Sequence, residues 1–342
     1  MIRYRYQGDG ERGFERFAAQ YSADALRGGY RSMLRIRRIE EAIEQRYHED
    51  QMKTPIHLVI GQEAAAVGCC SALRSTDLVY TSHRTHGAYL AKGGDLKAML
   101  SEMHCRINGC AGSRGGSMHL IDKAAGVAGT SAIVGGAVPI AVGAALAAQM
   151  KGDDRVVVTF LGDATTEEGV TSESLNFAAL KKVPVLFFCE NNFYSVQSPL
   201  ETRQPPGREL HRWAAAHEVR ACLVDGMNVL AVRDAVAEAA AHARAGAGPS
   251  FIEARVYRLR AHGGAGDDSQ TGYRDPAERD LWGVIDPVTM FGEYLRRTGL
   301  LDERTFDVME REIQHEIAEA FEHALASPHP EEADLQRHVY AP

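Results

Sequence analysis

The runs RVVVTFLGD at residues 155–163 and VPVLFFCENN at residues 183–192 decide the fold. Each is a short, continuously apolar segment that ends in polar residues, and a helical stretch, Glu167–Lys181, separates them. Continuous apolar runs are typical of strands buried on both faces, and a helix between two such strands indicates a parallel crossover. The middle of the chain therefore predicts an α/β unit built on a parallel sheet.

The same alternation continues on both sides of this unit. Further strands are predicted at Leu78–Thr81, Arg220–Val224 and Phe251–Tyr257, and further helices at Ser22–Asp50, Gly61–Leu73, Val229–Ala245 and within Asp286–Ala326. The expected fold is α/β, a doubly wound, mostly parallel sheet with helices on both faces and helical additions at both ends. We divide the chain into an N-terminal arm (1–21), one domain (22–327) and an irregular C-terminal tail (328–342).

Composition excludes several classes of protein. The 342 residues are 45% hydrophobic and 25% charged, as in globular proteins, and the net charge of −8 argues against a nucleic-acid partner. The six cysteines form no CxxC pair, which argues against a structural zinc site and favours a reducing compartment. Acidic residues interrupt the arginine-rich N-terminus, so we expect no signal or transit peptide and a cytoplasmic protein.

Two other segments need interpretation. Residues 124–150 carry no charge and are long enough to span a bilayer, but they consist largely of glycine and alanine. We interpret them as a buried glycine-rich loop followed by a helix from about Pro139, not as a membrane span. In the helix Arg31–Arg46, arginines alternate with glutamates, which favours a solvated or subunit-facing surface.

Four polar residues follow the ends of predicted strands: Asp163, Asn192, Asp225 and His262. In doubly wound sheets, ligands bind beyond the carboxyl ends of the strands. A carboxylate and an amide oxygen suit Mg²⁺ that already holds a phosphate group, and the helix beginning near Glu167 could donate backbone N–H groups to a pyrophosphate. Each signal alone has an ordinary structural explanation: a helix cap for the aspartate, a turn for the Asn pair and a solvated loop for the histidine.

The spacing of these residues adds a stronger signal. Asn192 follows Asp163 by 29 positions, and the pattern Gly162-Asp163 through Asn191-Asn192 resembles the motif of the thiamine-diphosphate-binding fold. Other segments match too: Gly115–His119, Ile133–Gly135, Val138–Pro139, Asp225–Met227 and His57–Ala64. From about Ser22 to its C-terminus the chain is similar to the alpha subunit of the decarboxylating component of 2-oxoacid dehydrogenase complexes.

The resemblance implies a set of site residues. Asp163, the side chain of Asn192 and the backbone carbonyl of Tyr194 are the implied Mg²⁺ ligands, and Arg84 is the implied diphosphate contact. The remaining implied cofactor contacts are His83, Gly162, Ala164, Thr165, His262 and, through their backbones, Ala132 and Val134. Two positions depart from the family: Ala164 stands where most relatives have glycine, and His83 stands where the pyruvate type usually has tyrosine.

Two histidines are the candidate catalytic residues. His262 aligns with the histidine of the family's flexible loop, and we expect the run Gly263–Gly272 to be mobile and to become ordered when cofactor binds. Gly263 replaces the phosphorylatable serine of mammalian relatives, which excludes that regulation at this position. His57 matches the family's histidine near the substrate; the alternative is a buried structural histidine.

The resemblance also implies the activity and the partners. Thiamine diphosphate acts as electron sink while carbon dioxide leaves a 2-oxoacid, and the acyl group passes to a lipoyl domain of an acyltransferase. The glutamate that activates the aminopyrimidine belongs to a beta subunit in this family, so we expect an alpha-two beta-two heterotetramer acting on a small, pyruvate-like 2-oxoacid. The alternatives are an acetoin-cleaving or acyloin-forming enzyme with another acyl acceptor and a non-catalytic assembly subunit.

Overall fold

The computed structural model describes residues 3–337 and 339–340 and contains a six-stranded sheet. The strand order is β2-β1-β3-β4-β8-β7, and every neighbouring pair in it is parallel. The strands are β1 (Leu78–Thr81), β2 (Val127–Thr130), β3 (Val157–Gly162), β4 (Val185–Asn191), β7 (Arg220–Asp225) and β8 (Ser250–Arg255). The expected α/β class is confirmed, although the sequence did not predict β2.

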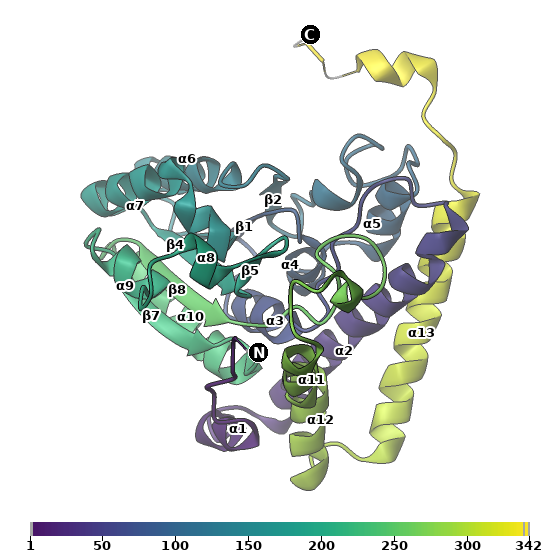
Figure 1. Cartoon of the computed structure of the whole chain (residues 1–342). Helices are drawn as coiled ribbons and strands as arrows, with labels where there is room; N and C mark the ends of the chain where they lie inside the picture. The colour runs from purple at the N-terminus through teal and green to yellow at the C-terminus, as the bar shows by residue number, and fades with distance from the viewer. Residues whose placement is uncertain (1–2, 338, 341–342) are drawn as a thin grey trace.

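Helices cover both faces of the sheet (Figure 1). One face packs against α6 (Ala137–Met150), α7 (Gly169–Lys181) and α9 (Leu210–Ala215), and the other packs against α3 (Glu63–Ser71) and α10 (Val229–Arg244). Strand β3 shows why two cores form: Val158 and Phe160 belong to one apolar cluster, whereas Val157 and Leu161 belong to the other. Successive side chains of a strand point to opposite faces, so a continuous apolar run fills both layers.

The remaining elements extend this core. They are α1 (Glu11–Ala18), α2 (Ala23–Arg46), α4 (His86–Ala91), α5 (Leu96–Met103), α8 (Leu200–Arg203), α11 (Pro276–Val284), α12 (Pro287–Arg297) and α13 (Glu303–Ala326), with a small antiparallel pair of β5 (Tyr194–Ser195) and β6 (Ser198–Pro199). The long helix α13 lies beside α2 at one end of the molecule (Figure 1). The expected arm thus contains a helix, α1, that its sequence did not predict.

The interpretation of Arg31–Arg46 as a solvated surface is wrong for its inner face. Arg37 forms ion pairs with Glu63 (2.6 Å) and Asp286 (2.6 Å), and both carboxylates are buried. Glu40 on the same helix is fully buried. The alternation of opposite charges does not reveal these buried residues, because Arg37 and Glu40 find their partners on other segments of the chain.

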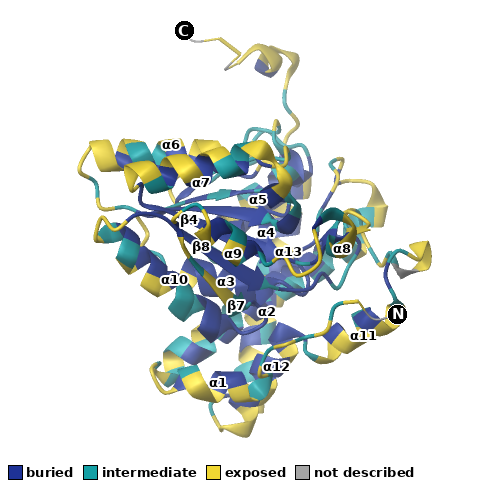
Figure 2. Ribbon diagram, turned by 60° about the vertical axis from the view of Figure 1, so that its left-hand side comes forward, coloured by how far each residue is buried: buried dark blue, intermediate teal, exposed yellow. Residues whose placement is uncertain are grey.

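Figure 2 shows where the chain is buried: the sheet is buried throughout its centre, and the outer surface of α6 is exposed. Within the described part of the chain, no helix combines the length and apolar character needed to cross a bilayer. The C-terminal segment extends away from the rest of the molecule and carries one 3₁₀ turn, Glu332–Gln336 (Figure 1). Residues 338, 341 and 342 of the expected tail lie outside the described residues.

Asp77 is predicted to be a major source of stability. Its buried carboxylate pairs with Arg244 (2.5 Å) and accepts hydrogen bonds from the backbone N–H groups of Val156 (2.8 Å) and Arg74 (2.7 Å). Asp77→Ala leaves Arg244 without its partner, and we expect it to lower the free energy of unfolding by about 3 kcal/mol, measured by urea titration. Asp154→Ala, which removes an exposed partner of Arg74, is the control and should cost less than about 1 kcal/mol. Equal losses in the two variants would contradict a special role for the buried pair.

Candidate functional site

The predicted site residues lie at one edge of the sheet. Strands β1, β3 and β4 are neighbours and run in the same direction, so the segments that follow them emerge at the same edge. His83 and Arg84 follow β1, Asp163 follows β3, and Asn192 follows β4. Of the four residues expected after strand ends, Asp163 and Asn192 thus lie at this edge, beside His83 and Arg84.

Asp163 is a buried carboxylate that is already neutralised by a cation. It begins a 3₁₀ turn, Asp163–Glu167, and its side chain forms an ion pair with Arg203 of α8, which also pairs with Glu167. Burial raises the pKa of Asp163, and Arg203 opposes this rise. Helix α7 begins only at Gly169, after this turn, so the N-terminus expected near Glu167 lies slightly further along the chain.

The two asparagines at the end of β4 have different roles. The Asn191 side chain donates to Glu253 (2.8 Å) and accepts from the Phe193 N–H (3.1 Å), which fixes the turn. Asn192 accepts from the Tyr194 N–H (3.3 Å) and donates to Gln62 Oε1 (3.1 Å). Asn191 is thus a structural residue, whereas Asn192 is the more exposed of the pair.

Three histidines gather beside this edge. The ring centroids of His57 and His83 are 4.7 Å apart, those of His57 and His262 are 5.1 Å apart, and those of His83 and His262 are 5.4 Å apart. Burial, reinforced by the positive charge of Arg84, lowers the pKa of His57 to about 2, that of His83 to about 4 and that of His262 to about 3. All three imidazoles are therefore neutral at pH 7, with one N–H donor and one acceptor nitrogen each.

Two guanidinium groups make this cluster electropositive. Arg84 is buried and donates to the carbonyl oxygens of Leu58 and His262, the latter at 3.0 Å. Arg258 donates to Tyr273 Oη (2.6 Å), and its Nη1 lies 3.5 Å from His262 Nδ1. Burial and the charge of Arg258 lower the pKa of Arg84 to about 9. Such a concentration of positive charge favours an anionic ligand.

The segment that carries His57 is fixed by a buried carboxylate. Glu40 accepts from the Val59 N–H (2.6 Å) and pairs with His86 Nδ1 (2.6 Å). The second nitrogen of His86 contacts the hydroxyl of Ser117 (2.7 Å), one of the motif residues. Glu40 therefore orients two predicted motif segments, although it lies on α2, far from both in sequence.

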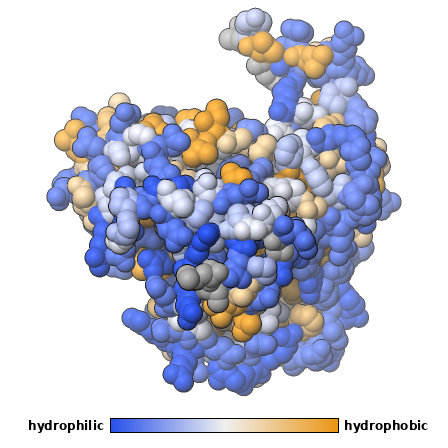
Figure 3. Space-filling view, viewed as in Figure 1, coloured by the Kyte–Doolittle hydropathy of each residue, from blue (hydrophilic) through white to orange (hydrophobic). Residues whose placement is uncertain are grey.

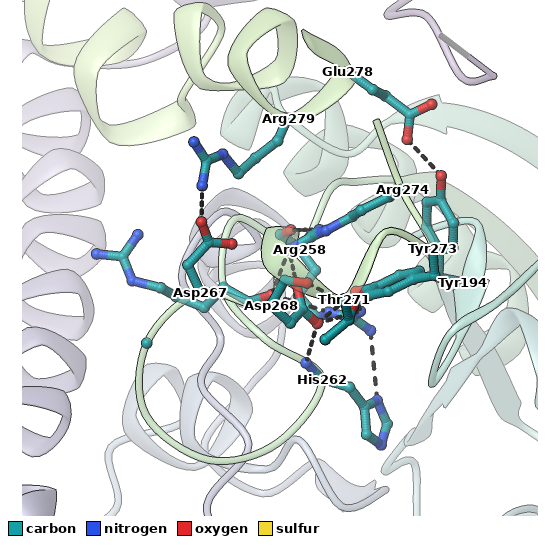
Figure 4. A network of polar contacts seen from close by, with 12 residues as sticks. Tyr194, Arg258, His262, Asp267, Asp268, Thr271, Tyr273, Arg274, Glu278 and Arg279 are labelled. Carbon is teal, nitrogen blue, oxygen red and sulfur yellow. Dashed lines mark hydrogen bonds and ion pairs between the residues drawn. The ribbon is translucent and has the colours of Figure 1, made fainter. Parts of the chain in front are cut away.

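The loop that carries His262 folds around one carboxylate, as Figure 4 shows. Asp268 accepts hydrogen bonds from the His262 N–H (3.2 Å), Tyr273 Oη (2.5 Å) and Arg274 Nη2 (2.7 Å). A Cβ atom added at Gly263 would lie 3.2 Å from His57 Nε2, so glycine permits a close approach of this loop to His57. The expected ordering of the loop by cofactor stays a prediction.

Other predicted residues lie elsewhere or have different surroundings. The loop after β2 leaves Val134 exposed and lets the Ala132 N–H donate to His119 Nε2 (3.3 Å). Thr165 is buried, and Ala164 is partly buried in the turn after Asp163. Asp225 does not join the site: it is the last residue of β7, the outermost strand, which β8 separates from β4, and Tyr6 donates a hydrogen bond to it (2.5 Å).

Sequence reasoning did not assign a site role to Gln62, Arg203 and Arg258, which contact predicted site residues. It also missed Glu40, which contacts one motif segment directly, at Val59, and a second through His86. Arg258 could have been considered, because it lies only three positions after strand β8. Arg203 carries no such signal, since nothing in its local sequence relates it to Asp163, 40 positions earlier.

Because these histidines are neutral in the folded chain, we expect the stability of the fold to decrease at acid pH. The unfolded chain binds a proton at each histidine below a pH of about 6.5, whereas the folded chain resists protonation of His83 down to a pH of about 4, so stability falls as the pH drops through this interval. We expect the fall in unfolding free energy between pH 7 and pH 5 to be about 2 kcal/mol smaller in His83→Gln than in the parent, measured by urea titration. The exposed His48→Gln variant should behave like the parent. The same loss in His83→Gln as in the parent would exclude a neutral, buried His83.

Comparison with known proteins identifies the family of this chain. Residues 31–333 match the family described as "Dehydrogenase E1 component". The chain is 35% identical over 319 residues to pyruvate dehydrogenase E1 component subunit alpha-3, chloroplastic, of Arabidopsis thaliana, which covers 91% of this chain and 73% of that protein. It is also 35% identical over 312 residues to the alpha subunit of acetoin:2,6-dichlorophenolindophenol oxidoreductase of Cupriavidus necator. This match covers 91% of this chain and 92% of that protein. The somatic mitochondrial pyruvate dehydrogenase E1 alpha subunit of Rattus norvegicus is 34% identical over 313 residues, a match that covers 91% of this chain and 78% of that protein. The chain belongs to the dehydrogenase E1 component family.

Proposed function

We propose that this chain is the alpha subunit of an enzyme that uses thiamine diphosphate and Mg²⁺ to decarboxylate a pyruvate-like 2-oxoacid and to pass the acyl group to a lipoyl domain. The observation that carries the proposal is the position of Asp163, Asn192 and Arg84 after three adjacent parallel strands, with His57 and His262 beside Arg84. Family membership supports it independently.

The residues present fit a metal-bound diphosphate. Asp163 and Asn192 offer the hard oxygen ligands that Mg²⁺ prefers, and Asp163 is a buried carboxylate that needs a cation. A Cβ atom added at Gly162 would meet nothing within 4 Å, so there is open space beside the residue that precedes Asp163. Asp163, the side chain of Asn192 and the carbonyl of Tyr194 would hold the metal, and Arg84 would contact the diphosphate.

Further residues would complete the cofactor site. His83, Gly162, Ala164 and Thr165 would line it, and the backbones of Ala132 and Val134 would contact the aminopyrimidine. When bound, the cofactor supplies the electron sink for loss of carbon dioxide.

The chain's own contribution is charge and proton transfer. Arg84 and Arg258 attract the carboxylate of a 2-oxoacid as well as the diphosphate. His57 and His262 are neutral at pH 7, so each imidazole offers one N–H donor and one acceptor nitrogen to the substrate. The guanidinium of Arg258 beside His262 Nδ1 disfavours the imidazolium, which makes a protonated His262 ready to return its proton.

The partner is proposed to be a beta subunit, in an alpha-two beta-two assembly that a lipoyl acyltransferase visits. Apolar side chains gather along the upper edge of Figure 3, where α6 lies. Exposed apolar residues in and around the predicted cofactor loop and the adjoining helices are Ile133 (74% exposed), Val134, Ile140, Met150 and Leu180. Apolar patches of this kind mark protein interfaces.

A second candidate function is cleavage of acetoin, favoured by the similarity to the Cupriavidus necator subunit. The two functions share the proposed site and differ in substrate and acceptor. Assays of the assembled enzyme with pyruvate or acetoin, each with lipoamide or with the dye 2,6-dichlorophenolindophenol, separate them. A subunit without catalysis would give no turnover in any combination.

Two substitutions at the metal site should have opposite effects. Asp163→Ala removes the charged ligand, so we expect no measurable Mg²⁺ binding in the presence of thiamine diphosphate. Arg203→Gln removes the cation that competes for Asp163, and a charge-assisted hydrogen bond of about 1.5 kcal/mol corresponds to about tenfold tighter Mg²⁺ binding. Isothermal titration calorimetry on the assembled enzyme measures both, with Glu173→Gln on the exposed surface of α7 as the control. Unchanged Mg²⁺ affinity in Asp163→Ala would refute the proposed site.

The proposal also predicts that this chain is inactive alone. We expect the purified chain, saturated with thiamine diphosphate and Mg²⁺, to decarboxylate no 2-oxoacid at a measurable rate, because the activating glutamate is expected on the beta subunit. Co-expression with a beta-type subunit should restore turnover and give a complex with two copies of each chain by native mass spectrometry. Robust turnover by the partner-free chain would show that the active site is not divided between subunits.

A further inference from the structure

A segment outside the region matched to the family contacts the proposed metal-binding turn. We call residues 3–10 the strap; the match to the family begins at residue 31. The Tyr4 ring of the strap stacks on Phe193, with centroids 4.6 Å apart and planes 10° from parallel. The same ring meets Tyr194 edge-on at 5.5 Å. The strap thus packs against the two residues that follow Asn192.

One buried carboxylate joins the strap to this turn. Glu278 of α11 accepts hydrogen bonds from the backbone N–H groups of Arg3 (2.7 Å) and Tyr4 (3.0 Å) through Oε2. Through Oε1 it accepts from the hydroxyl groups of Tyr194 (2.7 Å) and Tyr257 (3.0 Å); Figure 4 shows the contact with Tyr194. Because one carboxylate binds both segments, a shift of the strap would disturb Tyr194.

A second residue of α11, Trp282, also contacts the strap. The indole N–H of Trp282 donates to the Tyr4 carbonyl oxygen (2.9 Å), and the indole ring lies 5.8 Å from the Phe193 ring. Tyr4 is therefore held by α11 through its backbone, which leaves its ring free to support Phe193.

The turn needs this support because its backbone is strained. Phe193 has φ +68°, in the left-handed region that a bulky residue rarely occupies. The conformation costs of order 1 kcal/mol or more and persists only where the surroundings impose it. Phe193 lies between Asn192 and Tyr194, the two proposed ligands from this turn, so any relaxation of Phe193 would move both.

We propose that the strap is a positioning device for the metal site: Tyr4, fixed by Glu278 and Trp282, holds Phe193 in the left-handed conformation and thereby keeps Asn192 and Tyr194 in place as ligands. Tyr4 is a positioning residue, since it acts through Phe193. This inference rests on the proposed function, because it assumes that Asn192 and Tyr194 bind the metal.

The test compares variants of Tyr4 in the assembled enzyme. Mg²⁺ binding in the presence of saturating thiamine diphosphate is measured by calorimetry, together with kcat at saturating cofactor and Mg²⁺. We expect Tyr4→Ala to weaken Mg²⁺ binding about tenfold, as residues that orient metal ligands do, with kcat within twofold of the parent. Tyr4→Phe keeps the stacked ring and should bind Mg²⁺ within twofold of the parent. Arg5→Ala, an exposed change on the same strap, is the matched control and should have no effect.

A double-mutant cycle separates positioning from a general loss of stability. Glycine adopts positive φ without strain, so Phe193→Gly should remove the need for Tyr4, and adding Tyr4→Ala to it should change Mg²⁺ affinity less than twofold. Three results would each overturn the proposal. They are parent-like Mg²⁺ affinity in Tyr4→Ala, a loss of Mg²⁺ affinity in Tyr4→Phe as large as that in Tyr4→Ala, and a tenfold loss when Tyr4→Ala is added to Phe193→Gly. Absence of Mg²⁺ binding by the parent would instead refute the proposed function on which it rests.

Discussion

The parallel pairing of β1, β3 and β4 is the constraint on which the rest of the site depends. Residue by residue, Val157 to Gly162 pair with Val185 to Glu190, so the two strands end almost level with each other. Side chains that follow them emerge at one edge, the carboxyl end at which doubly wound sheets bind their ligands. The site is therefore a consequence of the sheet, and its chemistry is determined by which residues occupy three short connections.

The charges at this edge are divided into two zones. Asp163 and Glu167 form a negative zone, neutralised by Arg203, whereas Arg84 and Arg258 form a positive zone beside neutral histidines. A divalent metal suits the first zone and a phosphorylated or carboxylated ligand suits the second. A metal-bound diphosphate carries both kinds of charge, which is why this cofactor explains both zones together.

The parts of the structure that follow from local pattern could be predicted from the sequence. Strands β3, β4, β7 and β8 were predicted because continuous apolar runs end in polar residues, and Asp163 and Asn192 could be placed from those ends. Strand β2 was missed because its sequence, Val127–Thr130, is short and contains glycine. Helix α1 was missed because it is short.

The parts that depend on distant partners could not be predicted. The pairing of Arg203 with Asp163, the burial of Glu40 and the stacking of Tyr4 on Phe193 join residues that have no local relation in sequence. For the inner face of α2 the alternating charges gave a wrong prediction for the same reason, since charge alternation does not reveal that Arg37 meets Glu63 and Asp286.

The most direct test of the central claim is hydrogen exchange measured by mass spectrometry on the assembled enzyme, with and without thiamine diphosphate and Mg²⁺. If the cofactor binds at the carboxyl edge of the sheet, residues 82–86, 162–169 and 191–196 should become protected together, and the loop around His262 should follow. Protection confined to other parts of this chain, such as the region between the strap and β7, would contradict a cofactor site at this edge.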